Sequence, residues 1–142
     1  MMQRDIFILI PLIGYIGLWV LGSGLFLIYF RIFNVAIDVK NPVAMVQKLP
    51  AWLAILTTSA CSFLSFLATT RVVLNASVLT IDSREVIGIG TVALITAIIL
   101  DLLITVFGEK IDIRIFPLNW MYFLAWLVII PSILLGATHL GP

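Results

Sequence analysis

One acidic side chain lies inside a long apolar stretch of this chain. The stretch TAIILDLLITVFG covers residues 96–108, and Asp101 is its single charged residue. A carboxylate in the hydrocarbon core of a membrane costs on the order of 2.5–3.5 kcal/mol on insertion scales, and such residues usually face the interior of a helix bundle. Asp101 is therefore the first candidate for chemistry, as a group that binds a proton or a cation.

Other polar side chains are expected at a similar depth. The helical rise of 1.5 Å per residue places Asp101 about 9 Å inside the end of its apolar run, counted from the side of residues 108–117. Threonines and a tyrosine of two further runs lie near this level, and an arginine can extend its charged head over several ångströms. The predicted polar site comprises Asp101, Thr57, Thr58, Thr105, Tyr122 and Arg31.

Three hypotheses for Asp101 follow from its position. The carboxyl group could be hydrogen-bonded within the chain and fix the packing of the helices. It could instead be the proton- or cation-binding group of a small transporter. It could also contact a lipid headgroup, a cofactor or a partner subunit. Sequence alone leaves all three open.

The composition is that of a membrane protein. Of 142 residues, 63% are hydrophobic and 11% are charged, and the mean hydropathy is +1.24. An ordinary soluble domain contains roughly 25% charged residues. We therefore predict a protein whose main partner is the lipid bilayer.

The apolar residues form runs of the length that a membrane-spanning helix requires, which is about 20 residues. We predict an all-α membrane protein, a four-transmembrane-helix bundle, with residues 1–142 forming a single integral membrane domain. The predicted spans cover about residues 6–30, 51–74, 86–107 and 118–138.

Small residues indicate which faces of the helices meet. Helices pack in lipid through small side chains and hydrogen bonds between helices. Residues 57, 61, 65 and 69 form such a stripe at helical spacing, and so do residues 93, 97, 101 and 105. Asp101 thus belongs to the packing face of its helix. Because these stripes exceed the evident needs of one bundle, we also expect a homo-oligomer or a membrane-protein partner.

The residue inventory argues against metal and haem chemistry. Cys61 is the single cysteine and His139 the single histidine, so one chain supplies neither a multi-cysteine metal site nor a bis-histidine haem site. The predicted loops contain no glycine-rich phosphate loop and no nucleophile–base pair. We expect no cofactor, no nucleic-acid partner and no enzymatic activity.

The loop charges suggest an orientation. Arg4, Arg71 and Arg84 lie on the side of the termini, whereas five basic residues lie on the other side: Arg31, Lys40, Lys48, Lys110 and Arg114. The excess of positive charge is typical of cytoplasmic loops. We therefore expect the termini to be extracytoplasmic and the loops around residues 31–50 and 108–117 to be cytoplasmic. The longer loop contains Asn41 and Pro42, which favour a turn or the start of a short interfacial helix.

Residues 88–136 resemble an uncharacterised bacterial family of small four-helix membrane proteins, a domain of unknown function. The likeness consists of an Asp-containing third helix, a Phe-Pro pair and a last helix that contains tryptophan, here Asp101, Phe116, Pro117 and Trp126. The resemblance implies a four-helix fold in the bacterial inner membrane and assigns no activity.

The chain is also similar in outline to the small multidrug resistance transporters. Size, span number and weak charge bias agree, but the essential glutamate of those proteins lies in the first span, where residues 6–30 contain no acidic residue. Our leading hypothesis is a non-enzymatic membrane protein with a polar site centred on Asp101. The alternatives are a proton-coupled exporter of apolar cations and an accessory or lipid-binding subunit of a larger complex.

Overall fold

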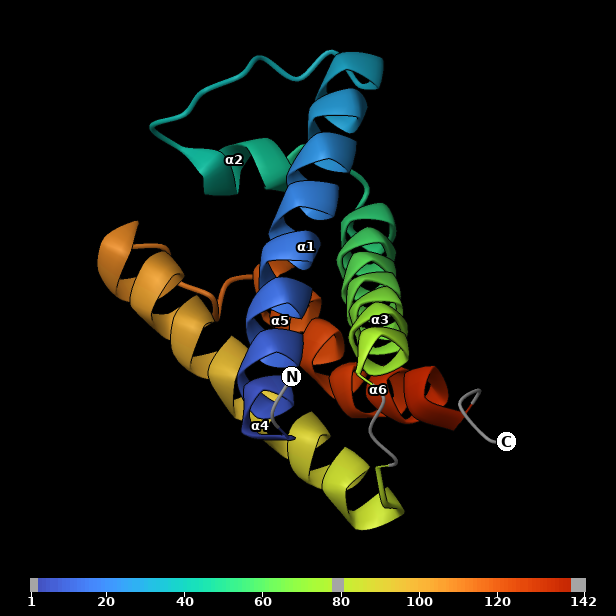
Figure 1. Cartoon of the computed structure of the whole chain (residues 1–142). Helices are drawn as coiled ribbons and strands as arrows, with labels where there is room; N and C mark the ends of the chain where they lie inside the picture. Colours follow the sequence, from blue (N-terminus) through green and yellow to red (C-terminus); the bar gives the residue numbers. More distant parts are fainter. Residues whose placement is uncertain (1–2, 78–80, 139–142) are drawn as a thin grey trace.

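The computed structural model describes residues 3–77 and 81–138, and every regular element in that part of the chain is a helix (Figure 1). The helices are α1 (Gln3–Ile32), α2 (Pro42–Gln47), α3 (Ala51–Ala76), α4 (Ser83–Asp101), the π-helical segment η1 (Leu102–Gly108), α5 (Leu118–Leu127) and α6 (Ile129–Thr138). Among the described residues, four stretches are long and apolar enough to cross a membrane: 4–32, 51–76, 83–108 and 118–138. The predicted four-helix membrane fold is confirmed.

Local sequence signals set several helix ends. Asn41 caps α2, because its side-chain oxygen accepts a hydrogen bond from the Ala44 amide, and Pro42 occupies the first turn, where the lost N–H is not needed. Asp82 and Glu85 form a reciprocal capping box at the start of α4. The short helix at Pro42 confirms one of the two structures expected there.

The last span is interrupted in the middle. Pro131 has no N–H to donate to the carbonyl of Leu127, the residue four positions earlier, and its ring crowds that carbonyl. Helix α5 ends at Leu127 and α6 begins at Ile129. The break changes the direction of the span, so that α5 and α6 follow different lines in Figure 1.

Helix α3 is the centre of the bundle, because α1, α5 and α6 all pack against it. Two buried serines of α3 donate hydrogen bonds to backbone carbonyls of neighbouring helices. The Ser65 hydroxyl donates to Gly14 O of α1 at 2.7 Å, and the Ser62 hydroxyl donates to Ala125 O of α5 at 2.8 Å. Hydrogen bonds of this kind hold helices together where lipid supplies no hydrophobic drive.

The small-residue stripes are packed inside the chain, as predicted. Residues 57, 61, 65 and 69 are buried, and so are residues 93, 97, 101 and 105. Because the stripes are already used within one bundle, they no longer argue for contact between copies. The expected oligomer stays a prediction.

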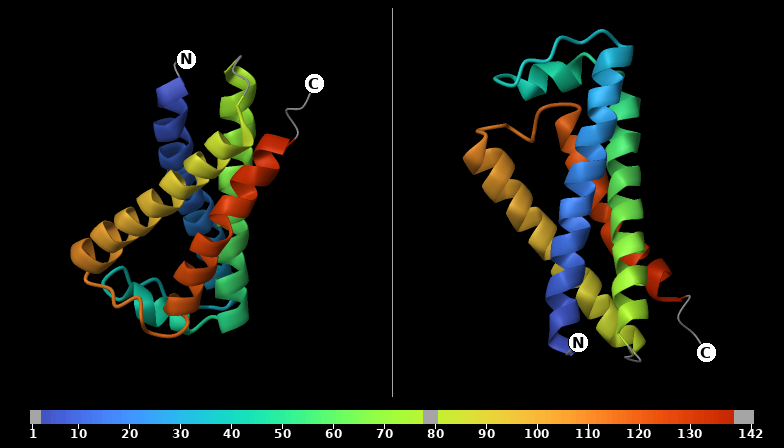
Figure 2. Two further views of the ribbon diagram at one scale, coloured as in Figure 1. Left: turned by 90° about the horizontal axis from the view of Figure 1, so that it is seen from below. Right: turned by 45° about the horizontal axis from the view of Figure 1, so that its top comes forward.

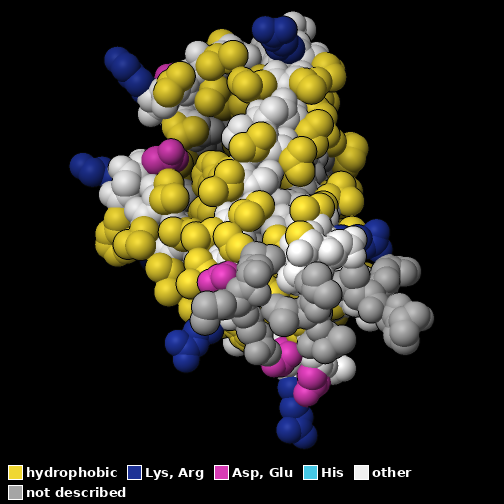
Figure 3. Space-filling view, in the orientation of Figure 1, with side chains coloured by type: hydrophobic (Ala, Val, Ile, Leu, Met, Phe, Trp, Pro, Cys, Tyr) yellow, Lys and Arg dark blue, Asp and Glu magenta, His cyan; other side chains and the backbone are white. Residues whose placement is uncertain are grey.

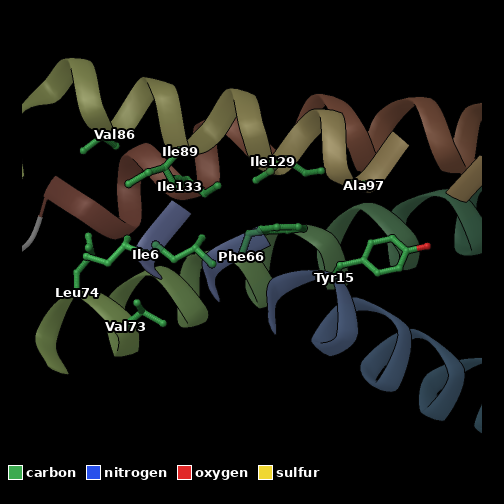
Figure 4. Packing of buried hydrophobic residues seen from close by; sticks show 12 residues of the cluster. Ile6, Tyr15, Phe66, Val73, Leu74, Val86, Ile89, Ala97, Ile129 and Ile133 are labelled. Atoms are coloured by element: carbon green, nitrogen blue, oxygen red, sulfur yellow. The ribbon is translucent and has the colours of Figure 1, made fainter. Parts of the chain in front are cut away.

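The bundle is closed at the end where α1 begins and α6 ends. There, side chains of all four spans form one cluster that includes Ile6, Phe66, Ile89 and Ile133 (Figure 4). Tyr15 lies at the edge of this cluster, and its hydroxyl group points away from the aliphatic side chains. The aliphatic core therefore ends at Tyr15, and polar contacts between the helices begin at its hydroxyl group.

The bundle is open at the other end, which we name the α2 end after the helix that lies across it. Helix α4 and its continuation η1 are inclined to α1, so that η1 stands to the side of α1 in Figure 1 and in the right panel of Figure 2. Met45 and Val46 of α2 pack in one cluster with Phe26 and Phe30 of α1. Val46 also packs against residues at the start of α5. Helix α2 thus covers the end of the gap that the inclination leaves.

The outer surface is suited to lipid. In Figure 3 hydrophobic side chains cover the middle of the visible face, and most of the charged side chains lie towards its margins. Asp112 and Arg114 form an exposed ion pair in the 109–117 segment. The Arg114 guanidinium group hydrogen-bonds the Asp112 carboxylate and lowers its pKa. These features agree with contact between the helices and a bilayer.

Replacing Gly136 with alanine should destabilise the bundle, because the added Cβ would lie 2.8 Å from the Cβ of Thr70 and 3.1 Å from the carbonyl oxygen of Leu67. Overpacking of this kind costs about 1–3 kcal/mol. Gly24→Ala is the matched control, because its Cβ meets nothing within 4 Å, and it should be neutral or stabilise the helix by up to about 1 kcal/mol. Reversible unfolding in mixed micelles would measure both, and equal stabilities of the two variants would contradict the packing described.

Candidate intramembrane binding site

Asp101 is buried at the last residue of α4, and 3% of its surface is exposed. Each carboxylate oxygen accepts a hydrogen bond from a different helix. The Tyr15 hydroxyl of α1 donates to Oδ1 at 2.7 Å, and the Trp126 indole N–H of α5 donates to Oδ2 at 2.6 Å. Asp101 therefore connects three membrane-spanning helices through two short hydrogen bonds.

These donors belong to two copies of one short motif. Residues 15–19 read YIGLW and residues 122–126 read YFLAW, so each contains tyrosine and tryptophan four positions apart. Residues at this spacing lie on one face of a helix. Their rings form neighbouring pairs, with centroids 6.3 Å apart in Tyr15–Trp19 and 6.1 Å apart in Tyr122–Trp126. From each pair one residue bonds Asp101, and the other lines the space beside it.

That space is a cavity of about 340 Å³ at the α2 end. It is bounded by α1, α2, α5 and one residue of α3, and Asp101 contributes to its wall. Aromatic rings line it at several levels, those of Trp19, Phe26, Phe30 and Tyr122. Its size falls in the range of small-molecule sites, which are apolar pockets with a few convergent polar groups.

No cationic side chain of the described chain neutralises Asp101. Asp101 forms no ion pair with a cation of residues 3–77 and 81–138, and the cavity wall contains no lysine, arginine or histidine. A carboxylate offers about four acceptor positions on its two oxygens, of which Tyr15 and Trp126 use two. Asp101 can therefore accept a proton, a donor group or a cation from a molecule in the cavity.

The structure brings several of the predicted site residues together. Thr58 and Tyr122 line the same cavity as Asp101. Thr105 is fully buried and lies 3.2 Å from the Tyr122 hydroxyl, so it joins the site through Tyr122. Thr57 is buried too, but its hydroxyl donates to Tyr29 at 3.3 Å, and it does not line the cavity.

Arg31, which the sequence analysis included in the polar site, is not brought to Asp101. Its side chain is exposed in the last turn of α1, and it forms no ion pair with Asp101. The residue of α1 that contacts Asp101 is Tyr15, which lies 16 positions, or about 24 Å along the helix, before Arg31. The expectation for Arg31 rested on comparing depths as if all helices ran parallel from one membrane face. In the structure α4 is inclined to α1, and α1 continues well beyond the level of Asp101 (Figure 2).

The sequence reasoning missed three residues of the site, Tyr15, Trp19 and Trp126. The repeated Tyr-x-x-x-Trp spacing was the signal that could have found them, because it places a hydroxyl and an indole N–H on one helical face twice in the chain. A buried carboxylate requires donors, and tyrosine and tryptophan supply them in an otherwise apolar span.

Within the described ranges, 3–77 and 81–138, no group of three or more histidine, cysteine or acidic side chains is placed to hold a metal ion. Cys61 is buried in α3 as a free thiol. His139, which the sequence analysis singled out, lies outside the described residues.

Comparisons of this chain with models of protein families, with curated proteins and with solved structures gave no match. The likeness of residues 88–136 to a family of unknown function stays a prediction. The function must therefore be argued from the geometry around Asp101.

Replacing Tyr15 with phenylalanine should destabilise the protein, because Asp101 loses one of its two buried donors. Hydrogen bonds to charged groups are worth about 1.5–3 kcal/mol. Tyr29→Phe is the matched control, since Tyr29 accepts one long neutral bond from Thr57 and should cost about 0.5–1.5 kcal/mol. Unfolding of both variants in mixed micelles tests this order. A larger loss in the Tyr29 variant would count against Asp101 as the centre of the polar contacts.

Proposed function

We propose that this protein binds a hydrophobic cation within the membrane, in the cavity whose wall contains Asp101, and exchanges that cation for a proton. It is proposed as a binding and transport protein rather than an enzyme. The observation that carries the proposal is a buried carboxylate in an aromatic-walled cavity, without a cationic partner in the described chain.

The chemistry of the cavity supports this class of ligand. Aromatic faces attract cations through their quadrupole, and more strongly where water is excluded. Trp19, Phe26, Phe30 and Tyr122 supply such faces, and Asp101 supplies the negative charge. An apolar cation would satisfy both features, because its charge would meet the carboxylate while its hydrocarbon groups would meet the rings.

A proton is the natural competitor for the same carboxylate. An unpaired charge at this depth is costly, so Asp101 is stabilised either by a proton or by a bound cation. When a cation binds the protonated form, the carboxylic acid gives its proton to water, and the carboxylate pairs with the cation. The total charge in the cavity is then the same before and after the exchange, namely zero, which supports coupling of the two movements.

The other hypotheses have less support. Tyr15 and Trp126 satisfy part of the carboxylate within the chain, which agrees with a packing role but does not account for the cavity beside it. The hypothesis of an accessory or lipid-binding subunit stays a prediction, as do the bacterial inner membrane and the extracytoplasmic termini.

Asp101→Asn should weaken the binding of methyltriphenylphosphonium, a permanent apolar cation, because the substitution removes the charge and keeps the shape. Loss of one partner of a buried charge pair costs about 2–5 kcal/mol, so the affinity should fall by at least about tenfold. Equilibrium binding to purified protein in nanodiscs would measure this, with empty nanodiscs as the blank and proton release recorded in weakly buffered solution.

Asp112→Asn is the matched control, because it removes a carboxylate from the exposed 109–117 segment and should leave the affinity unchanged. Gly22→Leu is a second test that keeps Asp101. A Cβ at Gly22 meets nothing within 4 Å, so the larger side chain should fill the cavity without disturbing the fold and should also reduce binding. Equal affinity of the wild type and the Asp101→Asn variant would refute the proposal.

A further inference from the structure

A second hollow lies next to the Asp101 cavity and reaches charged residues. It has a volume of about 440 Å³, and Lys40 and Glu109 line it. Both side chains are exposed, in the segment before α2 and directly after η1. This hollow is the route by which a ligand could pass between the aqueous side of the α2 end and the cavity.

Apolar side chains separate the two hollows. Leu27, Phe30, Pro42 and Met45 contribute to the walls of both. Phe30 and Met45 are buried and pack together with Val35 and Leu49 in one cluster. The partition is therefore part of the packing between α1 and α2, and it stands between the charged residues of the second hollow and Asp101.

Another part of the cavity wall, on α1, consists of residues that are themselves exposed on the outer surface. Gly22 lines the cavity, and a Cβ built there meets nothing within 4 Å. Ser23 and Leu27, which also line the cavity, are exposed, and 51% of the Leu27 surface is accessible. The neighbouring side chains of α1 on its outer surface are exposed and apolar, as expected for contact with lipid: Ile16, Val20 and Ile28.

The inclination of α4 is the reason for this opening. Helix α1 packs against α4, but η1, the continuation of α4, diverges from α1 towards the α2 end (Figures 1 and 2). The segment that would have closed the side of the cavity is thereby moved outward. The opening lies at the level of a membrane-spanning helix and not at its end.

We infer that the Asp101 cavity opens sideways into the bilayer at Gly22, and that its ligand enters from the lipid leaflet of the α2 end. This inference rests on the proposed function for the identity of the ligand, an apolar cation. It adds that the ligand is one that dissolves in membranes, such as an amphiphilic amine or a phosphonium ion, and that its local concentration is set by partition into lipid rather than by its concentration in water.

The opening can be tested without any ligand. On a Cys61→Ser background, single cysteines at Gly22, Gly24 and Lys40 would carry a nitroxide spin label in reconstituted bilayers. Collision of the label with oxygen, which concentrates in lipid, and with a neutral nickel chelate, which stays in water, would be measured at each position. Gly24 is the reference for lipid and Lys40 the reference for water.

We expect the label at position 22 to match position 24, with high accessibility to oxygen and low accessibility to the nickel chelate. A label at position 22 that matches position 40 would show that the cavity opens to water, and would overturn the sideways route even if methyltriphenylphosphonium binds. Poor access of both reagents to position 22 would show a closed cavity and would overturn it too.

Binding of methyltriphenylphosphonium to the unlabelled protein is measured separately, so the two failures can be told apart. Lipid-like accessibility at position 22 together with loss of binding in the Asp101→Asn variant supports the whole inference. Lipid-like accessibility with no binding by the wild type leaves a lateral opening but removes the ligand, and the inference falls with the proposed function.

Discussion

Much of this structure depends on the burial of one carboxyl group. Asp101 is buried, and no cationic side chain of the described chain pairs with it, so hydrogen-bond donors of the chain must satisfy its carboxyl group. Tyr15 and Trp126 bring those donors from two other spans. The relative positions of α1, α4 and α5 are thus coupled at a single point. A shift of any of these helices would break a hydrogen bond in a medium of low dielectric constant, where such bonds are strong.

Packing and polarity divide the bundle into two halves at the level of Asp101. On one side, aliphatic side chains of all four spans fill the space between helices that α3 holds together through Ser62 and Ser65. On the other side, the inclined α4 diverges, and helix α2 and aromatic rings border a cavity instead of a filled core. A soluble protein would lose hydrophobic stabilisation at such a gap. In a bilayer, lipid chains or a ligand can occupy it, so the gap is compatible with a stable fold.

The irregular helical segments lie at the same level as the site. The π-helical turn η1 begins directly after Asp101, and the break between α5 and α6 follows directly after Trp126 and Leu127. π-helical turns such as η1 are frequently found at functional sites. The break in the last span allows α5 and α6 to follow different directions while Trp126 stays in contact with Asp101.

The sequence by itself determined the class of the protein, the approximate limits of its four spans, and the faces on which helices meet. These properties follow from local hydropathy and from the helical period, both of which are readable from residues close in the chain. It also identified Asp101, since a charge in an apolar span is visible without any structure. Only the tertiary structure decided which residues meet that charge. Tyr15 and Arg31 both belong to α1, and the choice between them depends on the inclination of α4, which arises from packing between residues far apart in sequence.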